Sequence, residues 1–235
     1  MKDIEPITPK LNKGKHFIQR LIESGEGKHL DFKFEISDAK KIARSLAAFA
    51  NTEGGTLLVG VKDNGVIAGV RSDEEIYMIQ AAAEMYCKPK LPVTIQSWNI
   101  NGKIVLEVKV AKSKTIPHLA QNENKIWIAW IRVNDQNIIA NKVLQEVWNL
   151  SKNKTGITLK YSKNEEELLH FLFKNTKISL TSFCKLSYIS ELEAIQILSS
   201  LVVLKIVEIE FSETETYYLL RNNFNLEKYQ KDFND

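Results

Sequence analysis

Residues 46–63 read LAAFANTEGGTLLVGVKD, and this stretch decides the fold of the N-terminal part of the chain. It begins inside a helix whose apolar residues share one face, namely Ile42, Leu46 and Phe49. Asn51 ends that helix, and the glycine pair at 54–55 lets the backbone reverse without a Cβ penalty. The run TLLVGV is too short for a helix and apolar throughout, so it predicts a strand buried on both faces.

The residues around this stretch extend the same unit. Asp38 is the expected N-cap of the helix. Asp63 follows the buried strand where the chain surfaces, and Asn64-Gly65 predicts a tight turn after it. A short strand over residues 66–70 is expected to pair back on the buried strand.

Composition places the chain among soluble globular proteins. It has 235 residues, 44% hydrophobic and 26% charged, enough for one ordinary domain and a small second one. No apolar run approaches the roughly 20 residues that cross a bilayer, and the first residues lack a signal-peptide pattern. We therefore expect a cytoplasmic protein with no membrane association. The cysteines, Cys87 and Cys184, are far apart and are expected to be small buried hydrophobes rather than a disulfide.

Charge is divided unevenly along the chain. Residues 160–235 carry 9 Lys and Arg against 12 Asp and Glu, whereas residues 1–159 carry 23 against 17. The basic character therefore belongs wholly to the first part of the chain, which is the first indication of a polyanionic partner.

Several further elements are expected in the N-terminal part. A tail over residues 1–12 precedes a short amphipathic helix, 14–23, and a strand over 30–34 places Asp31 and Lys33 on the face opposite Phe32. A helix reaches about residue 86, and Asn101-Gly102 joins the two strands of a hairpin over 92–110 through a type I′ turn. A strand over 125–133 puts Trp130 and Arg132 on one face. A helix over 141–150 is expected to close this unit.

The C-terminal part follows a polar linker, SKNKTG, at residues 151–156. Asn164 with Glu167 is the expected start of a first helix, a second covers 180–186, and a capping box of Ser190 and Glu193 opens a third. Two β-rich runs, 204–211 and 216–220, flank a polar turn. Three helices and a hairpin in this order are the outline of a winged helix-turn-helix.

Three acids are candidates for chemistry: Glu26, Asp31 and Asp63. Carboxylates that converge near strand ends can hold Mg²⁺ or Mn²⁺, and such an ion can activate water and stabilise charge on a phosphate. Two plainer alternatives stay open at this point. An Asp before Asn-Gly is commonly a turn residue, and a charged residue on a strand is commonly solvated.

The motifs GEGKHLDFK, AFANTEGGTLLVGVKDNGVIAGV and IWIAWIRV occur in this order between residues 25 and 133, within a resemblance that covers residues 17–150. They resemble the Schlafen-type AlbA-like domain family, bacterial DNA-binding or transcription-regulator modules. The resemblance implies an α+β fold with a mixed sheet flanked by helices. In Schlafen ribonucleases the matching acids are the proposed catalytic set, so it also implies Glu26, Asp31 and Asp63 as candidate catalytic residues and metal ligands. Asp31 stands where the family has Glu, and Gly27 where Ser is common.

The resemblance also bears on binding residues and on assembly. Lys33 is implied as a phosphate contact, and Arg132 matches the family's strand arginine, whereas His118 is expected to be a surface-loop residue without a role. The Schlafen nucleases have a duplicated arrangement and this chain has one copy, so a homodimer would supply the second. Lys and Arg contacts to phosphate give salt-sensitive affinity. The candidate nucleic-acid-binding residues are Lys33, Lys40, Lys41, Arg44, Lys112, Lys114 and Arg132.

The predicted recognition helix of the C-terminal part is acidic at its N-terminal end, where Glu191 and Glu193 would repel phosphate. DNA reading and a role in assembly or partner docking both stay open for it.

The sequence therefore predicts an AlbA-like domain over residues 13–150 and a winged helix over 160–225. The leading hypothesis is a nucleic-acid-binding protein that acts as a bacterial transcription regulator, with DNA or structured RNA as partner and with homo-oligomers. The alternative is an endoribonuclease that depends on Mg²⁺ or Mn²⁺. A third hypothesis has the first domain bind a nucleotide or a protein.

Overall fold

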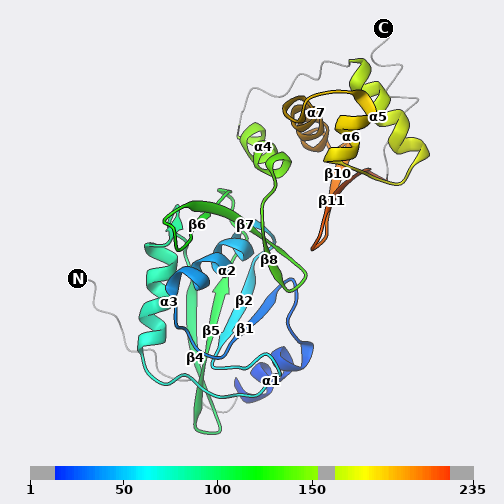
Figure 1. Ribbon diagram of the computed structural model, residues 1–235. Coiled ribbons are helices and arrows are strands. Elements are labelled where there is room, and N and C mark those ends of the chain that lie inside the picture. Colours follow the sequence, from blue (N-terminus) through cyan, green and yellow to red (C-terminus); the bar gives the residue numbers. More distant parts are fainter. Residues whose placement is uncertain (1–13, 153–161, 223–235) are drawn as a thin grey trace. The chain divides into compact units, whose positions relative to one another are not determined.

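The computed structural model describes residues 14–152 and 162–222 (Figure 1). The chain divides into two compact units, Met1–Ile139 and Ala140–Asp235. Both units combine helices and strands, so the predicted α+β class is confirmed. The expected tail over 1–12 and most of the expected linker, residues 153–156, lie outside the described residues.

A mixed four-stranded sheet is the centre of the first unit, with the strand order β1-β2-β5-β4. Strands β1 (Leu30–Lys33) and β2 (Gly55–Val59) run parallel. Strand β5 (Lys103–Val110) pairs antiparallel with both β2 and β4 (Thr94–Ile100). The TLLVGV run therefore supplies a central strand, as predicted.

A second sheet is antiparallel and has the strand order β3-β6-β7-β8. Only β7 (Trp127–Val133) was predicted. Strands β3 (Cys87–Lys88), β6 (Leu119–Gln121) and β8 (Gln136–Ile139) are two to four residues long. Strands this short contain too few residues to show a period of two.

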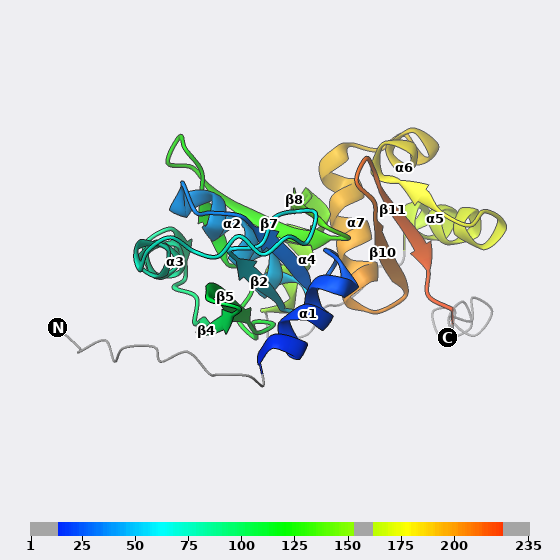
Figure 2. The same cartoon turned by 90° about the horizontal axis from the view of Figure 1, so that it is seen from below.

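Helix α2 (Ala39–Asn51) lies between the two sheets (Figure 2). Its apolar face, including Leu46 and Phe49, packs into a core shared with β2, β5 and helix α3 (Glu74–Glu84). The predicted N-cap is confirmed, because the Asp38 side chain accepts a hydrogen bond of 2.8 Å from Lys40 N. Only the N-terminal part of α2 reaches the surface, since every residue from Ser45 to Asn51 is buried.

Helix α1 (Gly14–Ser24) covers the opposite face of the first sheet. Its buried Ile18 packs with Phe32 of β1 and Leu58 of β2. The alternation along β1 is thus as expected: Leu30 and Phe32 face α1, and Asp31 and Lys33 face the α2 side.

The turn between α2 and β2 explains the motif residues there. Gly54 has a φ of +77°, and a Cβ on it would lie 2.7 Å from the Val110 carbonyl oxygen. A Cβ on Gly55 would lie 2.3 Å from the Phe49 ring. Asn51 ends α2, and its Nδ2 also donates to the carbonyl oxygens of His118 and Trp130, both at 2.8 Å. Asn51 therefore ties the end of α2 to the second sheet.

Two turn predictions had different outcomes. The type I′ turn between β4 and β5 is confirmed, since Asn101 and Gly102 have φ values of 53° and 83°. The strand expected over residues 66–70 is wrong. The segment makes a single bridge, between Val61 and Ile67.

The second unit contains α4 (Lys142–Ser151), α5 (Lys163–Lys174), α6 (Leu180–Ser187) and α7 (Glu191–Val203). Its sheet has the order β10-β11-β9, with β9 at Ile178–Ser179, β10 at Val207–Phe211 and β11 at Thr216–Leu220. The elements follow the predicted sequence of three helices and a hairpin, while their assignment to the winged-helix class stays a prediction.

Two details of the second unit differ from expectation. The helix over 141–150, expected to close the first domain, packs on α7 and contributes Val143 to the second core. The sequence could not show this, because an amphipathic helix between two domains suits either core. The start of α5 is a capping box of Ser162 and Glu165, not of Asn164 and Glu167.

Both cysteines are free thiols. Cys87 is buried in the first core, and this burial raises the pKa of its thiol to about 12. Cys184 is half-buried in the second unit. Among the described helices, none is by itself long and apolar enough to cross a membrane.

We predict that Gly55→Ala destabilises the protein by about 1–3 kcal/mol, because the added methyl group overlaps the Phe49 ring. Urea denaturation followed by circular dichroism measures the change. Gly27→Ala is the matched control, since a Cβ there meets nothing within 4 Å, and it should change stability little. Equal stability of the two variants would contradict the close contact at Gly55.

Candidate functional site

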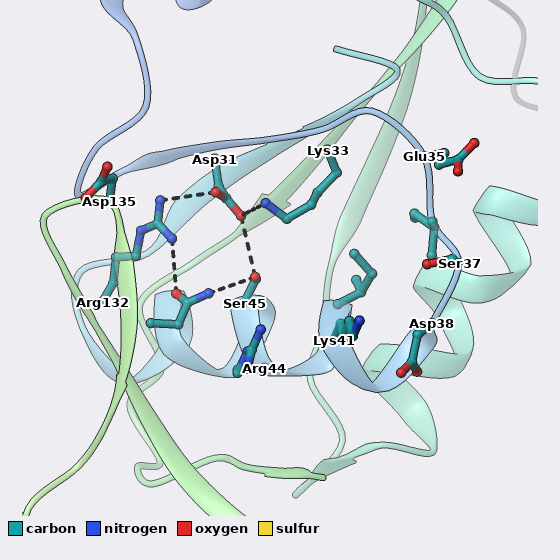
Figure 3. Close-up of a pocket in the computed structure, with 13 residues that line it drawn as sticks. Asp31, Lys33, Glu35, Ser37, Asp38, Lys41, Arg44, Ser45, Arg132 and Asp135 are labelled. Carbon is teal, nitrogen blue, oxygen red and sulfur yellow. Dashed lines mark hydrogen bonds and ion pairs between the residues drawn. The ribbon is translucent and has the colours of Figure 1, made fainter. Parts of the chain in front are cut away.

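Asp31 of β1 is the centre of a buried polar cluster. Its side chain is 5% exposed and lies between two cations. Lys33 Nζ is 2.9 Å from Oδ2, and Arg132 Nη2 is 3.3 Å from Oδ1 (Figure 3). The carboxylate is therefore neither solvated nor free, which corrects the expectation of a solvated strand residue.

The guanidinium group of Arg132 on β7 donates hydrogen bonds to several groups inside the protein. Nε donates to the Gly27 carbonyl oxygen at 3.1 Å, Nη1 to Asn137 Oδ1 at 3.1 Å, and Nη2 to the Leu30 carbonyl oxygen at 3.2 Å. The side chain is 1% exposed and lies over the Phe49 ring at 5.2 Å. Arg132 was expected to contact nucleic acid. Its burial corrects that expectation, because a phosphate cannot approach the guanidinium without displacing these partners.

Two further side chains close the cluster into a ring. Asn137 Nδ2 donates to Ser45 Oγ at 2.9 Å, and Ser45 Oγ donates to Asp31 Oδ2 at 3.5 Å (Figure 3). The four residues Asp31, Arg132, Asn137 and Ser45 come from β1, β7, β8 and α2, and we call them the buried ring. A buried network is stabilising only when its members are satisfied, and here each member has a partner.

Glu26 lies beside this ring without being part of it. Its Oε1 accepts a hydrogen bond of 2.7 Å from Phe32 N. Partial burial raises the pKa of the Glu26 carboxyl group, and the neighbouring Asp31 carboxylate raises it further, against the opposing effect of the Phe32 bond.

The structure does not bring Asp63 to the other two acids. Asp63 is exposed in the turn that follows β2. Leu57 is the register partner of Asp31, and six residues of extended chain beyond it span up to roughly 20 Å. The sequence suggested that the three acids lie close together because β1 and β2 are neighbouring strands. Asp63, however, comes after the segment of β2 that pairs with β1 has ended.

The predicted Mg²⁺ or Mn²⁺ site is therefore not assembled. Within residues 14–152 and 162–222, no three His, Cys, Asp or Glu side chains form a group that could hold a metal ion. The oxygens of Asp31 already face Arg132 and Lys33, which also makes the carboxylate a poor ligand. These residues do not fit the ion.

A cavity of about 260 Å³ opens beside the buried ring, between β1, the N-terminal part of α2 and the β7–β8 turn (Figure 3). Lys33, Lys41 and Arg44 line it together with the acids Glu35, Asp38 and Asp135. Asp38 is occupied as the cap of α2, and Glu35 lies 3.5 Å from Arg71.

Three basic residues share the surface at the start of α2: Lys40, Lys41 and Arg44. We call them the α2 basic surface, and all three line one shallow cleft with the end of β6 and the β6–β7 turn, residues 121–123. Aromatic rings hold two of them, since Arg44 lies over Trp130 at 5.2 Å and Lys40 over Tyr86 at 5.8 Å. Arg44 Nε is shielded from solvent and has no hydrogen-bond partner among the described residues. Lys41 is exposed.

The other predicted basic residues lie elsewhere. Lys112 and Lys114 are exposed in the loop that follows β5. A Cβ on Gly54 would lie 2.8 Å from Lys112 N, so Lys112 lies near the C-terminal end of α2. Neither lines the cavity or the cleft at the start of α2.

Sequence reasoning missed several residues. Ser45 and Asn137 gave no signal, because a single polar residue on a helix or in a short strand is unremarkable until its partners are known. Lys62 and Arg71 both lie over Phe34, at 5.3 and 5.7 Å. His118 is buried rather than on the surface, with its Nε2 2.8 Å from Ser113 Oγ and its Nδ1 3.0 Å from the Pro89 carbonyl oxygen.

Residues 26–141 match the model of the Schlafen AlbA_2 family. Residues 26–141 therefore form a Schlafen AlbA_2 domain, which confirms the resemblance seen in the sequence. No curated protein matches the chain.

Two solved structures are similar to the chain. The crystal structure of the DIP2311 protein from Corynebacterium diphtheriae is 20% identical, with a TM-score of 0.41, over 62% of this chain and 34% of that one. The NMR structure of an N-terminal domain from Nitrosomonas europaea is 19% identical, with a TM-score of 0.38, over 62% of this chain and 96% of that one. The latter protein is described as related to the ATP-dependent DNA helicase RecG. The match spans about a third of the length of the Corynebacterium protein.

We predict that Arg132→Met destabilises the fold by about 3 kcal/mol or more, because it leaves the Asp31 carboxylate buried beside Lys33 alone. Urea denaturation measures the change. The double variant Asp31→Asn with Arg132→Met also removes the uncompensated negative charge of Asp31, and it should recover part of the lost stability. Wild-type stability of the single variant would show that the buried ring is dispensable.

The raised pKa of Glu26 predicts a pH effect with a definite sign. The folded state holds the Glu26 proton more tightly than the unfolded state, so stability falls as the pH rises through the window just above the usual carboxyl range. Glu26→Gln should therefore gain stability relative to wild type at pH 7 and little or none at pH 4, as thermal unfolding can measure. A variant less stable than wild type at pH 7 would contradict this cause.

Proposed function

We propose that this protein binds nucleic acid and contacts the sugar-phosphate backbone through the α2 basic surface. The observation that carries this proposal is the gathering of Lys40, Lys41 and Arg44 on one cleft at the exposed end of a helix that is otherwise buried. A helix held between two sheets presents these charges in a fixed geometry. Fixed cations lose less conformational entropy on meeting a phosphate than cations on a loop.

Two further observations support this function. The motifs of the first unit resemble those of bacterial DNA-binding modules, and the basic excess of the chain lies in residues 1–159. Surface Lys and Arg supply most of the sequence-independent affinity for a phosphate polymer. We propose duplex DNA as the polymer and transcriptional regulation as the role.

The second unit has a different role in this proposal. At the N-terminal end of α7, Lys142 Nζ lies 2.8 Å from Glu191, and Asn164 Nδ2 donates to Glu193 at 2.9 Å. Both acids are thus held in place where a recognition helix would meet phosphate. We propose that this unit is a winged helix that serves self-association rather than DNA reading.

Charge reversal at the start of α2 tests the proposal. Lys40 and Lys41 are the second and third residues of α2, where Glu is favoured by the helix dipole. Lys41→Glu also places Glu three residues after the Asp38 cap, at the position of a capping box. The double variant Lys40→Glu with Lys41→Glu should therefore stay folded while it loses about tenfold in duplex affinity for each phosphate contact removed, at about 0.1 M salt.

Fluorescence anisotropy with a labelled duplex measures the affinity. The matched control is Lys15→Glu with Lys163→Glu, which makes the same charge change at first-turn lysines of α1 and α5. We expect this control to bind nearly as wild type. An equal loss of duplex affinity in both variants would show that net charge alone causes the effect. Unchanged affinity of the α2 variant would contradict the proposed surface.

A further inference from the structure

A second cavity, of about 350 Å³, lies on the α1 side of the first sheet. Leu106 and Val108 of β5 pack toward α2, so the residues that alternate with them face α1 and this cavity. The lining comes from α1, β4 and β5 and comprises Phe17, Thr94, Gln96, Trp98, Glu107 and Lys109. The cavity therefore lies across the sheet from the buried ring, and none of its residues belongs to the α2 basic surface.

Two aromatic side chains form part of the lining. The ring centroids of Phe17 and Trp98 are 5.5 Å apart and their planes are tilted by 43°. Both side chains are half-buried, so part of each ring stays accessible. Such rings offer a stacking surface to a planar ligand.

A buried carboxylate, that of Glu107 on β5, also belongs to the lining. Glu107 is 1% exposed although it belongs to the lining of an open cavity. Trp98 Nε1 donates to its Oε2 at 3.0 Å. Lys109 Nζ lies 3.0 Å from Oε1, but this oxygen has no hydrogen bond of acceptable geometry from the described residues. A carboxylate has about four acceptor positions, so Glu107 can still accept from a ligand.

The charges of the cavity select the kind of ligand. Lys109 neutralises Glu107, and its Nζ also lies 5.5 Å from the Phe17 ring centroid. The cavity therefore favours neither a free anion nor a free cation. It combines a stacking surface with a hydrogen-bond acceptor, which suits a neutral, planar group that carries N–H donors.

We propose that this cavity binds an unpaired nucleobase with an exocyclic amino group. The base stacks on Phe17 and Trp98 and donates from its amino group to Glu107, while Lys109 at the open side meets the adjoining phosphate. Carboxylates accept hydrogen bonds from the cytosine amino group in the same way. This inference rests on the proposed nucleic-acid function and adds to it a preference for single-stranded cytosine or adenine over thymine.

The experiment compares labelled oligo(dC), oligo(dA) and oligo(dT) of equal length by fluorescence anisotropy, with a labelled duplex in parallel. Thymine lacks an exocyclic amino group, so wild-type protein should bind oligo(dC) and oligo(dA) about tenfold more tightly than oligo(dT). Glu107→Gln should remove this preference. Phe17→Leu keeps an apolar side chain on α1 and should weaken binding of all three single strands about tenfold. Tyr77→Leu, at an exposed aromatic residue of α3, is the control and should bind as wild type.

The outcomes separate this inference from the proposed function. Neither variant should change duplex affinity, because the α2 basic surface is intact in both. Duplex binding without a base preference in the wild type would overturn this inference alone. A preference that survives Glu107→Gln, or single-strand affinity that Phe17→Leu leaves unchanged, would do the same. Wild-type protein that binds neither duplex nor single strands would overturn the proposed function too. Competition by the neutral nucleoside cytidine, reduced in both variants, would support the same site and show that it also accepts a free nucleoside.

Discussion

The buried ion pair between Asp31 and Arg132 is the interaction on which the arrangement of the first unit depends. It joins β1 of one sheet to β7 of the other, and Asn137 and Ser45 extend it to β8 and α2. Two charges removed from water cost several kcal/mol each, and only close partners offset that cost. Since Arg132 also donates to the carbonyl oxygens of Gly27 and Leu30, the pair is held from several directions and fixes where α2 lies.

The position of α2 separates the basic residues of the first unit into a buried group and a surface group. Arg132 lies inside the fold, where its charge holds elements together and is not available to a ligand. Lys40, Lys41 and Arg44 lie at the exposed start of the helix, where their charges act on the surroundings. Surface charges contribute little to stability, so they can serve binding at small cost to the fold. Helix α2 therefore has two roles: its buried part packs between the two sheets, and its N-terminal part presents the proposed contact surface.

The parts of the fold that were predictable are those that local chemistry determines. The Gly54-Gly55 turn, the Asn101-Gly102 hairpin and the buried TLLVGV strand each follow from a few neighbouring residues. The short strands β3, β6 and β8 were missed because they are defined by their partners in the sheet and not by their own pattern.

The candidate site was predictable only in part, for a related reason. The basic residues of α2 share a surface because they are close in sequence, and helix geometry brings them together. Asp31 and Arg132 are buried because they pair with each other, and they lie about 100 positions apart in the sequence, so no local pattern reveals the pair. The same limit applies to Asp63, whose distance from Asp31 depends on where the pairing of β1 and β2 ends.

The salt dependence of duplex DNA binding tests the central claim most directly. Each phosphate that the protein neutralises releases counterions, so three contacts from Lys40, Lys41 and Arg44 predict a slope of about −2.7 in a plot of log K against log salt concentration. Affinities measured from 50 to 300 mM NaCl would give this slope. A value near −3 or steeper agrees with phosphate contact by a fixed basic surface, and a slope close to zero would contradict it.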